Sequence, residues 1–323
     1  GSKYYQKQID KNELFKVNTI ADLRNFNGYY EGQEISLLGY YNSGDKPPLN
    51  YKFTIVDFDT KIDDGGSIIK SSRGLWVAQF GNEINSSDFG AFDENHGDST
   101  SKLQKLYDFA ILNNKKINIT HLHYITSSIK LNRSAEESRI ATITTTGNNV
   151  GGFIKYNGGF VFDSDNTDTS DFIFTSLRLM LFGDSVLING DNIIRVRIEN
   201  THLVWGGFIH APNRWLQSIR IKNNTVRNNT IPVVFFNHCF DSTFSDNVIE
   251  WGTTFIESNQ TVKKVSEFKQ DCAGIRIENN CIEGLKDTPI KLGRIVGGSI
   301  KGNFFESNIV SNLSNIDLSF SGL

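Results

Sequence analysis

The chain has 323 residues, 33 Lys and Arg against 36 Asp and Glu, and a formal net charge of -3 at pH 7. This length suits one large domain or two ordinary ones, and the charge balance lacks the basic excess with which nucleic-acid-binding proteins neutralise phosphates. The sequence has no run of about 18 apolar residues and no apolar signal-peptide core at its start, so we expect neither membrane insertion nor a nucleic-acid partner. The three cysteines, at positions 239, 272 and 281, lack zinc-ligand spacing, so we expect free thiols and no cofactor.

Residues 20–85 alternate short apolar segments with turns that contain Gly, Asp and Pro. This pattern is typical of short strands joined by tight turns. We interpret residues 1–86 as a small N-terminal β-rich head with its own core.

One segment, residues 98–114, has a convincing helical period. Its apolar residues fall on one face of a helix, and Asp98 or Ser99 can cap its start. We interpret residues 87–114 as a linker and a helix that covers the apolar end of the next domain, since an open solenoid end would expose its core. The residues of the apolar face are Leu103, Leu106, Tyr107, Ala110 and Ile111.

After residue 115 the sequence repeats one phrase, written CAGIRIENNCIEG at 272–284, LQSIRIKNNTVRN at 216–228 and IIRVRIENTHLVW at 193–205. The steps between equivalent positions are 23, 23, 33 and 23 residues, and the extra ten fall in the polar stretch 257–271. A fixed period of this size indicates a solenoid whose units bury their apolar faces against one another. The equivalent anchor positions are Thr201, Asn224, Asn247, Asn280 and Asn303.

The columns around the anchor show how each coil turns. The positions three before and two after it are apolar in every repeat, so both face the interior. The position directly before the anchor is Asn, Asp or Gly, residues that tolerate a left-handed backbone at a corner. Because no helical segment separates the strands, the pattern predicts an all-β protein in which residues 115–323 form a parallel β-helix of roughly nine coils.

The segment DFGAFDENHGDSTSKLQ, residues 88–104, resembles the entry segment of the pectate-lyase-like β-helix superfamily, and the preceding head is similar to the segment before the β-helix in bacteriophage tailspikes. The resemblance implies a right-handed parallel β-helix, an extracellular place on a virion tail or in a secreted protein, and homotrimers. It also implies a polysaccharide bound along the side of the solenoid. The matching positions are Phe89, Gly90, Ala91, Asp98, Thr100 and Gln104.

Acidic residues recur three positions after the anchor, and Glu250 and Glu283 are our candidate catalytic residues. Stacked coils would hold neighbouring carboxylates about 5 Å apart, and second neighbours about 10 Å apart, which brackets the spacings of retaining and inverting glycosidases. Arg227 stands one coil before this pair in the same column and is a candidate for substrate binding. The alternative interpretation is a solvated charged stripe on the outside of the solenoid.

Four further residues are candidates for substrate binding. Trp205 and Trp251 stand two coils apart, where an exposed indole can stack on a sugar ring or, alternatively, pack into a corner. Arg220 belongs to an outward arginine column that could hold an acidic polysaccharide or simply pair with neighbouring charges. Glu257 flanks the ten-residue insertion, and insertions in repeat proteins often map to the binding face.

We therefore predict a tailspike-like depolymerase that binds and hydrolyses a bacterial surface polysaccharide, such as a capsule, exopolysaccharide or O-antigen. The alternatives are a polysaccharide lyase and a β-helix that binds glycan without cleaving it. His210 and His238 stand beside no recognisable nucleophile motif, and we interpret both as corner residues.

Overall fold

The computed structural model describes residues 15–131, 141–145, 151–165, 168–258, 272–293, 295–309 and 316–318. The chain divides into two compact units, residues 1–90 and residues 91–323. Among the helices in the described ranges, none combines the length and the apolarity needed to cross a membrane.

The first unit is built on a five-stranded sheet with the order β1-β2-β3-β5-β4, in which β1 and β2 are parallel and the other pairs antiparallel. A capping box between Thr19 and Asp22 starts helix α1. The core centres on Trp76, which is fully buried, lies 5.0 Å from the ring of Phe53 and donates to the carbonyl of Phe26. The elements are β1 (Phe15–Val17), α1 (Ile20–Asn25), β2 (Glu34–Leu37), β3 (Leu49–Thr54), β4 (Ile68–Lys70) and β5 (Leu75–Ala78).

Helix α2 (Thr100–Leu112) confirms the predicted helix and its apolar face, because the five predicted residues are all buried. Asp98 Oδ1 accepts hydrogen bonds from the backbone and the hydroxyl of Thr100, so Asp98 binds the first turn. The Tyr107 ring of α2 lies 6.3 Å from Phe162 and 6.4 Å from Phe172, which places the helix over the apolar interior of the first coils. The short elements before α2 are β6 (Glu83–Asn85) and the 3-10 helices η1 (Ser86–Phe89) and η2 (Glu94–His96).

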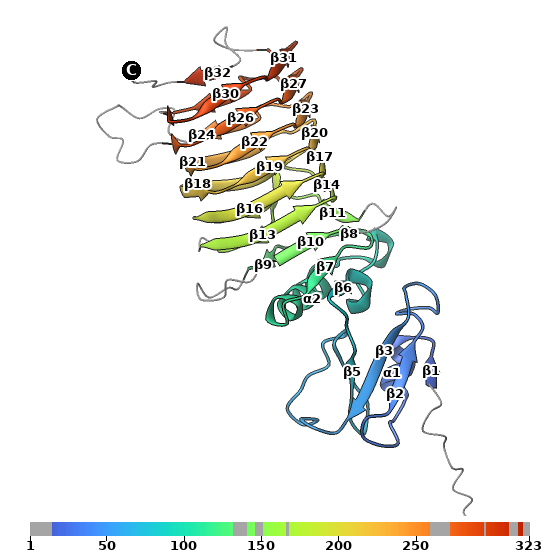
Figure 1. Ribbon diagram of the computed structural model, residues 1–323. Coiled ribbons are helices and arrows are strands. Elements are labelled where there is room, and N and C mark those ends of the chain that lie inside the picture. The colour runs from blue at the N-terminus through green and yellow to red at the C-terminus, as the bar shows by residue number, and fades with distance from the viewer. Residues whose placement is uncertain are drawn as a thin grey trace, which may run out of the picture. The chain divides into compact units, whose positions relative to one another are not determined.

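The second unit is a parallel β-helix, as predicted (Figure 1). Within the described residues the strand pairs of its coils are parallel, and the strands form three ladders along the solenoid. The first ladder contains β9 (Ile129–Lys130), β12 (Gly159–Asp163), β15 (Ser185–Asn189), β18 (Gly207–Gln217), β21 (Val234–Phe240), β24 (Ile256–Ser258), β28 (Ile290–Leu292) and β32 (Ile316–Leu318). The second contains β7 (Lys116–Asn118), β10 (Ala141–Thr144), β13 (Thr169–Thr175), β16 (Ile193–Glu199), β19 (Arg220–Lys222), β22 (Thr243–Ser245), β26 (Arg276–Glu278) and β30 (Ser299–Lys301).

The third ladder has eight strands within the described residues, against the roughly nine coils expected from the repeat length. Two short strands, β25 (Cys272–Ala273) and β29 (Ile295–Val296), pair with each other, and β25 also pairs with the end of β21. The third ladder contains β8 (Leu122–Tyr124), β11 (Gly152–Lys155), β14 (Arg178–Leu181), β17 (His202–Val204), β20 (Thr225–Arg227), β23 (Val248–Glu250), β27 (Cys281–Glu283) and β31 (Phe304–Glu306).

The predicted anchor column is a buried asparagine ladder. Asn247 Oδ1 accepts from the backbone N–H and from Nδ2 of Asn224, and Asn280 Oδ1 does the same for Asn247. The position before each anchor has a positive φ, from 53° at Asn200 to 65° at Gly302, so the expected left-handed corner is confirmed.

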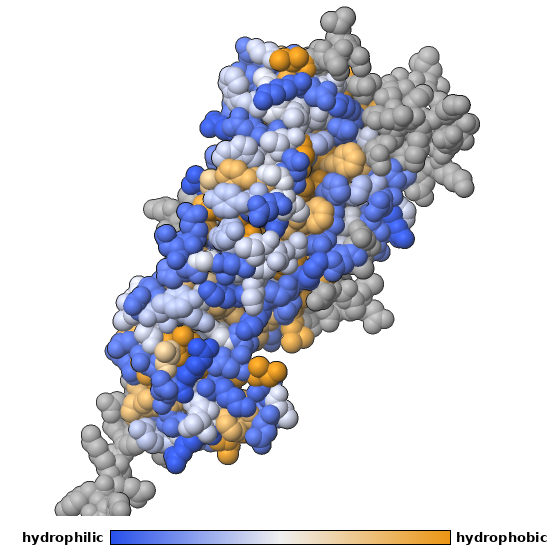
Figure 2. Space-filling view, turned by 180° about the vertical axis from the view of Figure 1, so that it is seen from behind, coloured by the Kyte–Doolittle hydropathy of each residue, from blue (hydrophilic) through white to orange (hydrophobic). Residues whose placement is uncertain are grey.

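The apolar columns on either side of the anchor fill the interior, where Ile221 and Phe244 are fully buried. On the face of the molecule that Figure 2 shows, most exposed side chains are hydrophilic, and smaller hydrophobic groups lie between them. Alternation along each strand therefore separates the apolar interior from an outer surface that carries the functional candidates. Most of the predicted insertion, residues 259–271, lies outside the described residues.

Candidate functional site

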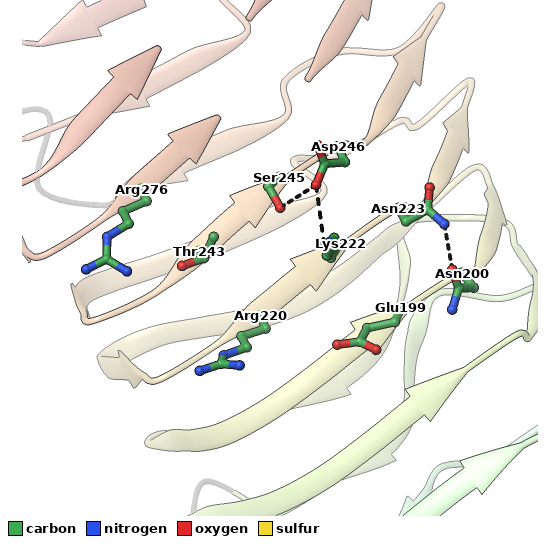
Figure 3. A pocket seen from close by; sticks show the side chains of 9 residues that line it. All are labelled: Glu199, Asn200, Arg220, Lys222, Asn223, Thr243, Ser245, Asp246 and Arg276. Carbon is green, nitrogen blue, oxygen red and sulfur yellow. Dashed lines mark hydrogen bonds and ion pairs between the residues drawn. The ribbon is translucent and has the colours of Figure 1, made fainter. Parts of the chain in front are cut away.

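An open cavity of about 740 Å³ lies on the outer face of the second ladder. We call it the basic groove (Figure 3). Its shape follows from side-chain length: β22 presents the short Thr243 and Ser245, whereas β19 and β26 on either side present the long Arg220 and Arg276. The residues that line it are Glu199, Asn200, Arg220, Lys222, Asn223, Thr243, Ser245, Asp246 and Arg276.

Charges are unevenly compensated along this face. Arg197, Arg220 and Arg276 share one register column, with Thr243 between the last two, and no salt bridge joins any of these arginines to another described residue. In the neighbouring column Lys222 Nζ lies 3.8 Å from Asp246 Oδ2. The arginine column therefore keeps its positive charge available at the surface.

A smaller cavity of about 300 Å³ continues from Arg220 toward β13 and β16. It includes Arg197 and also Arg195, whose guanidinium makes a bidentate contact with Asp171 at 2.6 and 2.7 Å. Two cavities thus share Arg220, the arginine that the sequence singled out.

The acidic column lies on the third ladder, where Glu250, Glu283 and Glu306 are direct register partners on successive strands. Arg227 Nε donates to Glu250 Oε2 at 2.7 Å from the strand before. The pKa of the neighbouring Cys281 thiol is raised, first by burial and then by these three carboxylates. Three carboxylates and one arginine therefore act within electrostatic reach of one another.

The two tryptophans differ in their surroundings. Trp205 stacks on Phe182 with ring centroids 4.0 Å apart, and Phe182 stacks in turn on Tyr156 at 4.9 Å. Trp251 directly follows Glu250 and is 56% exposed. Trp251 therefore presents an exposed indole beside the acidic column.

Glu257 lies on a third face, in an apolar cavity of about 420 Å³ on the first ladder. Its carboxylate is 3.5 Å from Lys291 Nζ. The predicted residues therefore do not form one cluster: Arg227, Glu250, Glu283 and Trp251 come together, whereas Arg220 and Glu257 lie on the other two ladders. The cavity lining is Gly159, Phe160, Asp184, Val186, Ile209, His210, Ile231, Pro232, Phe235 and Glu257.

The sequence interpretation underestimated His210, which lies half-buried in this apolar cavity between Phe160 and Phe235. Its Nδ1 is 2.9 Å from Asn189 Oδ1, while Asn189 Nδ2 donates to Asp163. Because an amide oxygen only accepts, Nδ1 carries the proton and Nε2 is the acceptor of the neutral ring.

Two pKa shifts support this arrangement. Burial opposes ionisation of Asp163, but hydrogen bonds from Asn189 and Lys130 outweigh it and lower the Asp163 pKa. Burial also lowers the pKa of His210, which favours the neutral ring.

Comparison with known proteins agrees with this architecture. The model of the phage tail protein small four-stranded beta-sheet domain matches residues 16–81. No curated protein sequence matched the chain.

Three solved structures resemble the chain over most of its length. The tailspike gp49 of an Acinetobacter baumannii bacteriophage, a capsular polysaccharide depolymerase, is 13% identical with a TM-score of 0.59, and the match covers 92% of this chain and 60% of that one. The tailspike of Acinetobacter baumannii phage AM24 is 16% identical with a TM-score of 0.58, covering 90% and 56%. Pantoea stewartii WceF, a glycan biofilm modifying enzyme with a tailspike-like parallel β-helix fold, is 14% identical with a TM-score of 0.58, covering 94% and 50%.

At these identities the likeness establishes the fold. The matches span 50 to 60% of the three longer chains. The protein thus joins an N-terminal sheet that matches the phage tail domain to a solenoid with the parallel β-helix fold of the tailspike structures.

Proposed function

We propose that the chain belongs to a tailspike-like depolymerase that binds and cleaves a bacterial surface polysaccharide outside the cell, on a phage tail. The observation that carries the proposal is the acidic column beside the exposed Trp251. The phage tail domain match and the depolymerase among the similar structures support it. Assembly into homotrimers is part of the same proposal.

The register of the acidic column suits a retaining hydrolase. Neighbouring parallel strands lie about 4.8 Å apart, close to the separation of about 5 to 5.5 Å between the carboxyl groups of retaining glycosidases. Arg227 orients the carboxylate of Glu250 by a 2.7 Å hydrogen bond, which suits a nucleophile. Glu283, on the next strand, is then the acid and base.

In the first step Glu250 would form a bond to the anomeric carbon while the glycosidic C–O bond breaks and Glu283 gives its proton to the departing oxygen. In the second step Glu283 would take a proton from water, whose oxygen displaces Glu250 and releases the sugar. Trp251 supplies an apolar surface on which a neighbouring sugar ring can stack.

The test is incubation with a panel of purified capsular and lipopolysaccharide glycans, following reducing ends together with absorbance near 235 nm. We expect new reducing ends without absorbance, and a loss of at least about 100-fold in rate for Glu250→Gln and for Glu283→Gln. Glu83→Gln, an exposed change in β6 of the first unit, is the matched control.

Each other outcome assigns a different function. Reducing ends accompanied by absorbance would identify a lyase. Binding without cleavage across the panel would identify a glycan-binding module. Full activity in Glu250→Gln and Glu283→Gln would contradict the assignment of these two residues.

A further inference from the structure

We propose that the basic groove binds the acidic groups of an anionic polysaccharide, so that the protein selects glycans that carry carboxylates. This inference rests on the proposed function and adds the substrate class. It starts from the second ladder, whose outer face is separate from the acidic column on the third.

The dimensions of the groove fit a sugar chain. Its walls, β19 and β26, are two strand spacings apart, or about 10 Å, with the short residues of β22 as its floor. A pyranose ring fits a channel of this width, and the hydroxyl group of Thr243 on the floor matches a sugar hydroxyl, whereas Ser245 Oγ donates to Asp246 Oδ2 at 3.0 Å.

The two ends of the groove differ in charge. Arg220 and Arg276 extend at one end from the starts of their strands, whereas Asn200, Asn223 and Asp246 lie at the corner end (Figure 3). Each guanidinium presents five N–H donors in a planar fork that matches a carboxylate. The arginine end therefore suits the acidic group of a sugar, and the corner end suits its hydroxyls.

The arginines of this column are not held by ion pairs within the described residues. Within the described residues Arg197, Arg220 and Arg276 form no salt bridge, in contrast to Arg195 and Arg227, which pair with acids at 2.6 and 2.7 Å. Three like charges in one register column repel one another, and an anionic ligand would relieve that repulsion. The column thus favours a bound anion over an empty face.

A glycan fits these charges better than a nucleic acid does. The chain carries a net charge of -3, and Glu199 and Asp246 lie in the groove itself. A continuous phosphate backbone would meet these carboxylates, whereas a polysaccharide can place neutral hydroxyls there.

The test is affinity electrophoresis of the whole chain in gels that contain polygalacturonate, the same polymer after reduction of its carboxyl groups, or single-stranded DNA. We expect polygalacturonate to retard the protein and the reduced polymer not to. The double variant R220Q/R276Q should bind polygalacturonate at least about tenfold more weakly, because each charge-assisted contact is worth a factor of that order. Arg178→Gln, an exposed arginine on the third ladder, should bind as the wild type does.

Three results would overturn the inference: equal retardation by both polymers, equal loss of binding in the Arg178→Gln control, or stronger retardation by DNA. Its failure is separable from that of the proposed function. Cleavage of a neutral glycan with full activity in R220Q/R276Q would remove this inference and leave the depolymerase proposal. Arginine-dependent binding of polygalacturonate without cleavage of any glycan would do the reverse.

Discussion

Replacing Asn247 by alanine should destabilise the solenoid by about 3 kcal/mol. The Asn247 side chain, 1% exposed, makes four hydrogen bonds: Oδ1 accepts from the backbone N–H of Asn224 at 3.1 Å and from its Nδ2 at 3.0 Å, and Nδ2 donates to Ile221 O at 3.0 Å and to Asn280 Oδ1 at 2.9 Å. After the change, Asn224 Nδ2 still donates its hydrogen bond to Ile198 O, and Asn280 Oδ1 still accepts one from the backbone N–H of residue 247.

The buried backbone N–H of Asn224 would be left without its partner, at a cost of about 1 to 3 kcal/mol, and the other lost bonds add a smaller net term. For a unit of this size the melting temperature should fall by roughly 6 to 12 °C. Thermal unfolding followed by circular dichroism measures this. Asn303→Ala is the matched control, because Asn303 belongs to the same ladder but is half-buried, so water can replace part of what is lost. An equal fall in both variants would refute the reasoning.

Three further outcomes are expected. His123 is almost fully buried and its pKa is lowered by burial to about 4, so the unfolded chain takes up its proton first. The contribution of neutral His123 to the free energy of unfolding is fully present above pH 6.5 and should fall by about 1.4 kcal/mol per pH unit between pH 6.5 and pH 4. Urea unfolding measures this fall, which should be shallower in His123→Gln. Lys46→Met should lower the free energy of unfolding by about 3 to 5 kcal/mol, because it leaves the buried Asp88 carboxylate without the ammonium that lies 2.9 Å from it. Adding Asp88→Asn should restore part of this loss in the same urea assay. Trp251→Ala should weaken glycan binding about tenfold and leave the melting temperature unchanged, because this indole is exposed. Trp205→Ala should lower the melting temperature, because it removes the stacking of Trp205 on Phe182. Titration calorimetry measures the binding and scanning calorimetry the melting temperature.

The sequence alone determined the solenoid. Its period places Asn224, Asn247 and Asn280 in one column, and a buried amide at that column bonds its copies above and below. A corner residue before each anchor must adopt a positive φ, which restricts it to a few residue types and makes it visible in the sequence. The asparagine ladder and the left-handed corner recur once in every coil, so the repeat in the sequence is enough to reveal them.

The same period brought Glu250 and Glu283 together, because both follow their anchors by the same three residues. The sequence could not assign Arg220 and Glu257 to a face, since a residue's ladder depends on where the backbone turns between strands. Nor could the sequence decide between the two settings of Trp205, which stacks on Phe182 across a coil boundary.

Only the tertiary structure revealed His210 and the open groove. His210, Asn189 and Asp163 are separated by steps of 21 and 26 residues, neither equal to the repeat, so no period connects them. The basic groove exists because the short Thr243 lies between two long arginines on the neighbouring strands, so its shape depends on the sizes of side chains from three different coils. Repetition along the chain determines a backbone that stacks, but the surface between coils is set by side chains that meet only when the coils have formed.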